Sequence, residues 1–290
     1  MGAPHAAGVR QEHGMKFGIS TFVNEDTIDP VSLARAIEER GFTALAVAEH
    51  THIPASRESP YPLGGELPKI YYRTLDPFVT LAAAAAVTST IELITGIALL
   101  IQRDPIVTAK EAASIDVISG GRFTFGVGAG WNIEELRQHG TDPKTRGALL
   151  DERIEAIKAL WTEEPAEYHG KYVDFAPSYQ RPKPVQKPHP PILIGGDSDA
   201  TVRRIIRHEA GWISNPLPIE HLSRRIDQIR ASATYEVPLV QFGTPAKPDY
   251  WHAAQEIGFG QLNLLLPTKP LDVSLRLLDD YAEQVQRYGG

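Results

Sequence analysis

The feature that most constrains the fold of this chain is a repeated alternation of short apolar runs with helical patterns. Three of the helical patterns open with an Asp-Pro pair, which suits the N-cap and the first turn of a helix. Because each run precedes a helix and is almost wholly apolar, the pattern predicts a parallel α/β fold with both sheet faces covered. The eight expected strands are residues 17–21, 44–50, 91–99, 122–128, 191–195, 211–215, 238–242 and 261–266.

The number of repeated units decides between two parallel architectures. An open, doubly wound sheet is the alternative, but eight βα units within residues 15–290 favour closure into a (β/α)8 TIM barrel. Residues 163–191 carry seven prolines and interrupt the alternation, which predicts a long insertion before strand five that crosses the barrel rim. Residues 1–14 are polar and lack the apolar stretch of a signal peptide, so we expect a flexible N-terminal tail before one barrel domain.

The composition excludes several classes of function. The 290 residues contain no cysteine, which rules out disulfides, thiolate catalysis and cysteine–zinc sites and suits a reducing cytoplasm. The net charge is −7 without a run of basic residues, unlike nucleic-acid binders and proteins of anionic membrane surfaces. The apolar runs are too short to cross a bilayer. We therefore expect a cytoplasmic protein with a small-molecule substrate, no nucleic-acid partner and no membrane partner.

Polar side chains at strand ends are the first candidates for chemistry, because barrel enzymes place their active sites there. His50 ends the second strand, and its near-neutral pKa suits a general acid or base that the adjacent Glu49 could tune. The alternative is a buried, hydrogen-bonded pair without a catalytic role. His50 and His52 are also spaced to share a metal, but no later strand end offers a histidine, so we expect no metal site.

Glycines follow the third and fourth strands. Gly96 marks a bulge or a close approach to a flat group, although a tight spot in barrel packing would also explain it. Gly128 and Gly130 alternate, which lets the backbone approach a ligand and exposes its N–H groups, or simply makes a turn.

A further glycine pair precedes the helix after the fifth strand. The free N–H groups of that helix attract a phosphate, and Ser198 could add a hydroxyl beside Gly195 and Gly196. Asp197 and Asp199 would oppose an anion or cap the helix. Taken together, the strand ends predict a phosphate-bearing cofactor lying across the barrel mouth.

Several motifs, in order and at these distances, resemble the bacterial-luciferase-like monooxygenase superfamily, and within it the branch of probable F420-dependent oxidoreductases. The resemblance covers about residues 15–287. The motifs that carry it are AEHTHIP at 48–54, DPF at 76–78, TGIALL at 95–100, SGGRF at 119–123, GVGAGW at 126–131, KPVQ at 183–186, PPI at 190–192, GG at 195–196 and GW at 211–212.

The resemblance implies a TIM barrel with an insertion before strand five and a flavin-type cofactor, either F420 or FMN. It also implies a non-proline cis peptide bond between Thr95 and Gly96 that supports the cofactor ring, and it places Glu49 and His50 beside that ring. The cofactor-binding positions that it implies are Thr95, Gly96, Ile97, Gly128, Ala129, Gly130, Trp131, Gly195, Gly196 and Ser198. Trp131 stands where some F420 relatives carry a glutamate, which argues against a sugar-phosphate dehydrogenase and leaves a second acid or base unassigned.

Three functions compete on these motifs. The first is hydride transfer between F420 and a small organic substrate, with His50 as acid or base and Glu49 hydrogen-bonding nearby. The second is an FMN-dependent two-component monooxygenase supplied by a partner reductase, and the third is a redox-inactive flavin-binding barrel. By analogy with relatives we expect a homodimer.

The loop after the second strand is the candidate substrate lid. Residues 51–75 are long for a barrel loop and follow the strand that carries His50. A packed surface loop is the alternative. The side chains expected to face a substrate are Arg57, Tyr61, Tyr71 and Tyr72.

Overall fold

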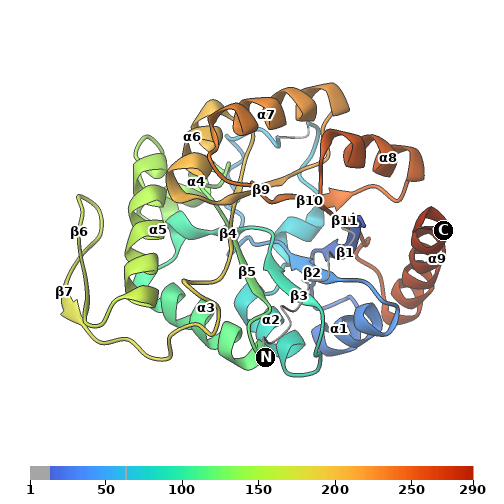
Figure 1. Cartoon of the computed structure of the whole chain (residues 1–290), viewed down its shortest axis with the longest axis horizontal. Coiled ribbons are helices and arrows are strands. Elements are labelled where there is room, and N and C mark those ends of the chain that lie inside the picture. Colours follow the sequence, from blue (N-terminus) through green and yellow to red (C-terminus); the bar gives the residue numbers. More distant parts are fainter. Residues whose placement is uncertain (1–13, 63, 290) are drawn as a thin grey trace, which may run out of the picture.

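A computed structural model describes residues 14–62 and 64–289, and these form a closed parallel barrel surrounded by helices (Figure 1). The strands run in the order β3-β2-β1-β11-β10-β9-β8-β5-β4, and pairing of β3 with β5 closes the barrel. The predicted TIM-barrel fold is confirmed. Its strands are β1 Lys16–Thr21, β2 Ala44–Val47, β3 Glu92–Thr95, β4 Ala98–Leu99, β5 Phe123–Gly128, β8 Ile192–Gly195, β9 Gly211–Ser214, β10 Leu239–Thr244 and β11 Gln261–Leu265.

Helices begin where the Asp-Pro pairs predict. Asp29, Asp76 and Asp104 each accept hydrogen bonds from first-turn N–H groups, and a proline follows each cap. The α-helices are α1 Pro30–Glu39, α2 Pro77–Ala85, α3 Pro105–Ser119, α4 Ile133–Gln138, α5 Arg146–Thr162, α6 Asp199–His208, α7 Ile219–Ser232, α8 Pro248–Ile257 and α9 Leu271–Gly289, with 3-10 turns η1 Lys69–Tyr72 and η2 Leu100–Gln102.

The hydrophobic core has two parts. The larger part lies between the barrel and its helices and buries Trp161, Trp212 and Trp251 completely. The smaller part fills the barrel interior with side chains such as Ile94 and Leu193. The interior is therefore packed, and space for a ligand is left at the mouth, where the strands run into their loops.

The predicted third strand, 91–99, is interrupted. A cis peptide bond joins Gly96 to Ile97 between β3 and β4, one bond beyond the predicted position at Thr95 and Gly96. The Thr95 hydroxyl donates to the Gly126 carbonyl at 2.7 Å. A Cβ atom on Gly126 would lie 2.0 Å from the Thr95 carbonyl oxygen, so this close approach of β3 and β5 requires glycine.

Two other sequence-based boundaries differ from the structure. The predicted strand 44–50 ends at Val47, which leaves Glu49 and His50 on the following loop. The insertion before strand five contains an antiparallel hairpin, β6 Ala166–His169 with β7 Asp174–Ser178, which the proline-rich pattern did not predict. Figure 1 shows this hairpin at the edge of the molecule, beside α5.

The domain boundaries stay a prediction, because most of the expected tail, residues 1–14, lies outside the described residues. Within the described ranges, no helix combines the length and the apolar character needed to span a bilayer.

Candidate functional site

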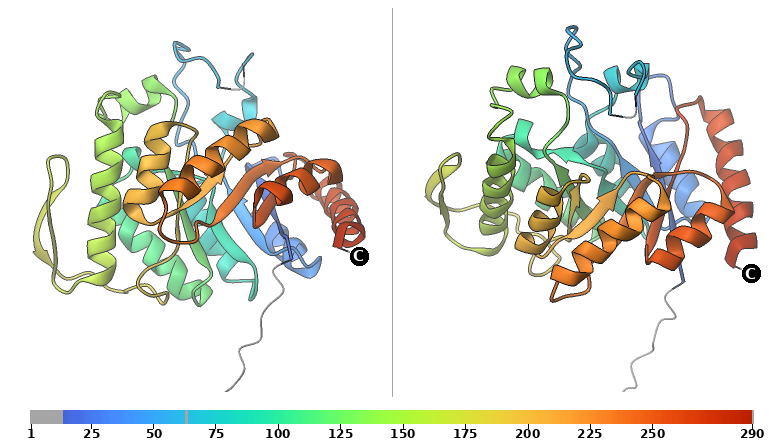
Figure 2. Two further views of the ribbon diagram at one scale, coloured as in Figure 1. Left: turned by 45° about the horizontal axis from the view of Figure 1, so that its top comes forward. Right: turned by 90° about the horizontal axis from the view of Figure 1, so that it is seen from above.

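A cavity of about 760 Å³ opens at the carboxyl ends of the barrel strands, a volume that suits a cofactor or drug-sized ligand. Residues 51–62 and 64–75, which follow β2, stand with α4 above this end of the barrel (Figure 2). The barrel thus brings together segments that are far apart in the sequence. Predicted site residues that line the cavity are Glu49, His50, Tyr71, Gly96, Ile97, Ala129, Gly130, Trp131, Gly195, Gly196 and Ser198.

Two predicted cofactor residues lie behind the cavity wall. Thr95 is fully buried with its hydroxyl bound to β5. A Cβ atom on Gly128 would lie 2.1 Å from Ile97 Cδ1, so Gly128 leaves the space that the Ile97 side chain occupies. Both residues shape the bulge without reaching the ligand space.

The inner wall of the cavity carries apolar side chains that sequence reasoning missed. Phe22, Leu99 and Phe242 line it together with Ile97. A Cβ atom on Gly96 would lie 2.5 Å from Phe242 Cδ2, so glycine allows the bulge to pack against this ring. Apolar walls with few polar groups suit a flat aromatic ring system.

His50 pairs with a carboxylate that sequence reasoning did not single out. Its Nδ1 lies 2.9 Å from Glu135 Oε2, and both side chains are buried, with 6% and 1% of their surfaces exposed. Since a carboxylate accepts, Nδ1 donates, and Nε2 is the nitrogen left for the cavity that His50 lines. Nε2 makes no hydrogen bond to the described part of the chain.

The signal for Glu135 is present in the sequence. The pair Glu134 and Glu135 opens a short helix, α4, directly after the glycine turn that ends at Trp131. His50 and Glu135 are 85 positions apart in the sequence, so only the fold shows that they are partners.

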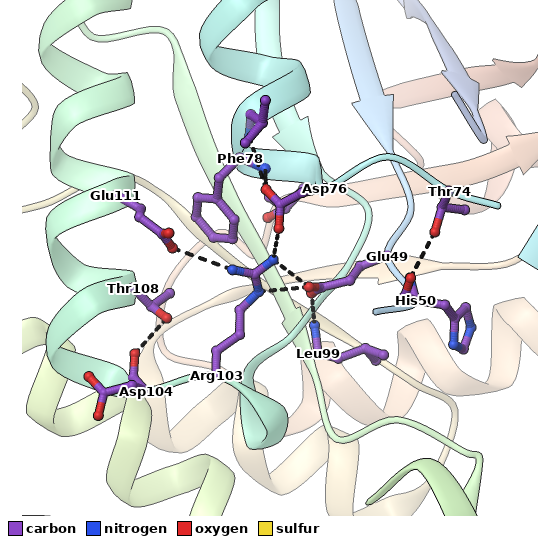
Figure 3. Close-up of polar contacts among 12 residues, drawn as sticks. Glu49, His50, Thr74, Asp76, Phe78, Leu99, Arg103, Asp104, Thr108 and Glu111 are labelled. Atoms are coloured by element: carbon purple, nitrogen blue, oxygen red, sulfur yellow. Dashed lines mark hydrogen bonds and ion pairs between the residues drawn. The ribbon is translucent and has the colours of Figure 1, made fainter. Parts of the chain in front are cut away.

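Glu49 faces away from His50 and belongs to a separate ion-pair cluster (Figure 3). Its carboxylate accepts from Arg103 Nε at 2.7 Å and from the Leu99 N–H at 2.6 Å. Arg103 also pairs with Asp76 and Glu111. Glu49 was expected to hydrogen-bond close to His50, but it binds Arg103 instead. The cluster around Arg103 connects the loop after β2 to η2, α2 and α3.

Arg103 is the cation that the three carboxylates of this cluster, Glu49, Asp76 and Glu111, share. Burial raises the pKa of Glu49 above its ordinary value, while the Arg103 guanidinium and the Leu99 N–H act in the opposite direction. Burial alone would lower the pKa of Arg103, but its attraction to Glu49 and Asp76 outweighs this and raises it. The guanidinium also lies over the Phe78 ring, 4.5 Å from its centre.

The opposite end of the cavity suits an anion. Ser198 is the N-cap of α6, and Gly196 precedes it with a φ of +119°. A helix N-terminus favours an anion, because its first N–H groups have no partner within the helix. Asp197 and Asp199, which sequence reasoning expected to oppose an anion, both bind Arg225 of α7, at 3.1 Å and 2.8 Å.

Basic side chains add to this end. Lys144, just before α5, and Arg146, its first residue, line the cavity and were not predicted as site residues. Arg204 also lines it, with its guanidinium held by Asp151 at 2.7 Å. This anion-binding end thus gathers cationic side chains from the start of α5 and from α6, beside the N-terminus of α6. The Asp197 carboxylate also lines the cavity but is paired with Arg225.

The candidate lid residues divide between two places. Tyr71 lines the cavity, its ring 5.1 Å from that of His50, and its hydroxyl lies 3.2 Å from that of Tyr61. Arg57, Tyr61 and Tyr72 line a separate hollow within the loop. Arg57 and Tyr61 both lie against the ring of Trp131, which lines the cavity.

The spacing of His50 and His52 does not bring them to a common point. His50 binds Glu135, whereas His52 Nε2 lies 2.6 Å from Gln138 Oε1. Over residues 14–62 and 64–289, no three His, Asp or Glu side chains gather closely enough to hold a metal ion.

A family model described as luciferase-like monooxygenase matches residues 15–246. The chain belongs to this family. The predicted membership in the luciferase-like superfamily is confirmed.

Relatives and solved structures agree with this assignment. An uncharacterized Mycobacterium tuberculosis protein, Rv0953c, is 42% identical over 261 residues, covering 89% of this chain and 85% of its own. The FMNH2-dependent dimethylsulfone monooxygenase of Pseudomonas putida is 33% identical over 145 residues, covering 49% of this chain and 40% of its own.

Two solved structures share the fold. The monooxygenase RslO1 of Streptomyces bottropensis has a TM-score of 0.78 at 23% identity, over 95% of this chain and 100% of its own. The F420-dependent tetrahydromethanopterin reductase of Methanopyrus kandleri has a TM-score of 0.73 at 16% identity, over 95% and 99%. The fold thus occurs with monooxygenase and with F420-dependent activities.

Proposed function

We propose that this protein is an F420-dependent oxidoreductase that transfers a hydride between the deazaflavin and a small organic substrate. The observation that carries the proposal is the polarity of one cavity. Its inner wall is apolar, one end holds His50 paired with Glu135, and the other end gathers Ser198 and basic side chains. A phosphorylated tricyclic cofactor matches this order: its flat ring suits the apolar wall beside His50, and its phosphorylated tail suits the basic end.

The residues present fit such a cofactor. Gly96, Ile97 and Phe242 would contact its ring, while Ser198, Lys144 and the first turn of α6 would hold its phosphate. The cofactor would supply hydride transfer when bound, and the protein orients it and manages protons. His50 then takes or gives a proton at Nε2, the nitrogen that faces the cavity.

Aromatic rings beside His50 support this role on the substrate side of the cavity. Tyr71 and Trp131 stand beside His50, their ring centres 5.1 Å and 5.9 Å from it. A substrate held against these rings would meet Nε2 with little water around it. The loops that form this side set its shape, so the identity of the substrate rests on residues outside the cofactor end.

An FMN-dependent monooxygenase is the second candidate. It is favoured by the likeness to the FMNH2-dependent dimethylsulfone monooxygenase, which extends over 49% of this chain. In that case a partner reductase would supply reduced flavin. For the F420 function, a dehydrogenase would supply reduced deazaflavin in the same way.

The proposal is tested by turnover with each cofactor in turn. Reduced F420 is mixed with reducible enones, and oxidised F420 with secondary alcohols, while cofactor absorbance is followed. FMN with a flavin reductase and oxygen is the parallel assay. We expect oxidation or reduction of F420 with at least one substrate class; consumption of oxygen with FMN and no turnover with F420 would contradict the proposal.

We further propose a homodimer. The outward faces of α2 and α3, which pack side by side, carry exposed aliphatic side chains. A face of this kind suits a second copy that presents the same two helices across a two-fold axis.

A further inference from the structure

Two buried polar atoms behind His50 lack partners. Glu135 uses Oε2 to bind His50, while its Oε1 is buried without a hydrogen bond in the described residues. His139 Nε2 is in the same state. Buried polar atoms are nearly always satisfied, so two such atoms need an explanation.

The two side chains are neighbours on one helix. The His139 N–H donates to the Glu135 carbonyl at 3.2 Å, so one helical turn separates the residues. Side chains four positions apart lie on the same helix face, about 5–6 Å apart at Cβ. A water molecule between Glu135 Oε1 and His139 Nε2 would satisfy both atoms.

The series of polar groups continues to the surface. The ring of His139 lies 5.1 Å from that of His52, and His52 Nε2 binds Gln138 on the exposed side of α4. Four titratable side chains therefore lead from the cavity to solvent on the far side of the cavity wall. They are His50, Glu135, His139 and His52.

This arrangement matters because a bound cofactor and substrate would fill the cavity that His50 faces. His50 would then have no direct contact with bulk water on that side. An acid or base that works in a covered site needs another route for its proton.

We propose that Glu135 and His139 form a proton relay between His50 and solvent. This inference rests on the proposed function, in which His50 is the acid or base. When His50 accepts a substrate proton at Nε2, its Nδ1 proton passes to the Glu135 carboxylate. Rotation of that carboxyl group presents the proton to the bridging water, which protonates His139 Nε2, and His139 releases a proton toward His52 and solvent. When the cavity empties, Nε2 of His50 releases its proton to water, and a proton from solvent returns through His139 and Glu135 to Nδ1, which restores the first tautomer.

The surroundings of His139 favour this role. Burial lowers its pKa below the ordinary value, and the charges of His52, Arg103 and Arg153 act in the same direction, against Glu135. His139 is therefore neutral near pH 7, with one ring nitrogen able to accept and the other able to donate.

The test compares His139→Gln, which keeps a polar side chain but cannot carry a proton, with Arg137→Gln as the control. Arg137 is exposed on the same helix and forms only a 3.5 Å pair with Glu58. The first readout is the exchange of the His50 Nδ1 proton with water, measured by nuclear magnetic resonance with F420 or FMN bound. We expect His139→Gln to slow this exchange roughly 100-fold, the lower end of the contribution of a positioned proton-transfer group. Equal exchange rates in both variants would overturn the relay.

The second readout is turnover at rising concentrations of imidazole. The relay predicts that His139→Gln lowers kcat and that imidazole restores it, because a small base replaces the missing carrier. A kcat equal to wild type, or a loss that imidazole does not restore, would overturn the proposal. His139→Asn serves as a second variant if the glutamine variant unfolds. Failure to bind either cofactor would contradict the proposed function, whereas unchanged proton exchange in the loaded protein would contradict the relay alone.

Discussion

At the scale of single residues, the state of His50 is set by where its two nitrogens lie. Nδ1 is held by a carboxylate that is 1% exposed, and Nε2 faces the cavity. A fixed tautomer and orientation are what a general acid or base requires, since misplacement of the ring would cost proton transfer. Because Glu135 holds Nδ1 and leaves Nε2 to the cavity, His50 differs from a buried histidine whose two nitrogens are both bound within the protein.

Replacing His50 tests its assignment. His50→Asn removes the proton carrier and keeps a polar side chain of similar reach. We expect kcat to fall by about 10²–10⁴-fold, the usual contribution of a general acid or base, with cofactor affinity nearly unchanged. Steady-state kinetics and cofactor titration measure the two quantities, and full turnover by the variant would show that another group carries the proton.

Arg103 stabilises the fold by compensating the buried charge of Glu49, and substitutions of the two residues test this role. Arg103→Met leaves Glu49 buried without its cation, and such a loss costs about 3–5 kcal/mol of unfolding free energy. The double variant Glu49→Gln with Arg103→Met removes both charges, and it should recover part of that loss. Urea denaturation measures both values; a single variant as stable as wild type would show that the cluster contributes little.

At the scale of elements, α4 connects the lid to the barrel. Glu134 accepts hydrogen bonds from the Glu58 and Ser59 N–H groups, at 2.5 Å and 2.8 Å, and from the Ser59 hydroxyl. Glu135, the next residue, binds His50. One short helix thus fixes the loop that covers the cavity and the residue expected to do chemistry inside it.

The Glu134 anchor predicts a dependence on pH. Although burial acts to raise it, the hydrogen bonds from Ser59 and Glu58 lower the pKa of Glu134 from 4.5 to about 2. A lowered folded-state pKa stabilises the protein fully above pH 4.5, and this contribution is lost as the pH falls toward 2. Glu134→Gln should therefore lower the unfolding free energy by about 2 kcal/mol at neutral pH. The difference from wild type in urea denaturation should shrink below pH 4.5; a constant difference would contradict the anchor.

The sequence predicted helices and strands well where the residues that determine them are neighbours in the chain. The caps at Asp29, Asp76 and Asp104 and the alternation of strands and helices depend on neighbouring residues, and the structure confirms them. The break in the third strand at Gly96 and the hairpin before β8 depend on packing against distant strands and helices, so their details were not predicted.

The site shows the same division. The glycines and His50 were found because strand ends are marked in the sequence, and the fold brings all of them except Gly128 to one cavity. The partners were not found: Glu135 for His50, and Arg103 for Glu49 in place of the expected histidine. Partner choice is decided by the directions of adjacent side chains and by residues up to 85 positions away, which sequence periodicity does not encode.

At the scale of the whole molecule, the outer face of α2 and α3 predicts self-association. Val79 on α2 is 70% exposed, and Ile106, Val107, Val117 and Ile118 lie exposed on α3. The double variant Val79→Asp with Ile118→Asp should give a monomer, because a dimer would bury both charges without partners. Light scattering coupled to size exclusion measures the mass, with Leu271→Asp, an exposed position on α9, as the control. A wild-type monomer would contradict the proposed homodimer.

The central claim concerns the cofactor that the barrel mouth holds, and binding tests it most directly. Purified apoprotein is titrated with F420 and with FMN, and thermal unfolding is followed at each concentration. A ligand at 100 times its Kd stabilises the folded state by about 2.7 kcal/mol, which a thermal shift detects readily. We predict that F420 stabilises the protein more than FMN at equal concentration, with Lys144→Ala weakening the effect. Stabilisation by FMN alone would contradict the F420 assignment, and stabilisation by neither would contradict the cofactor site itself.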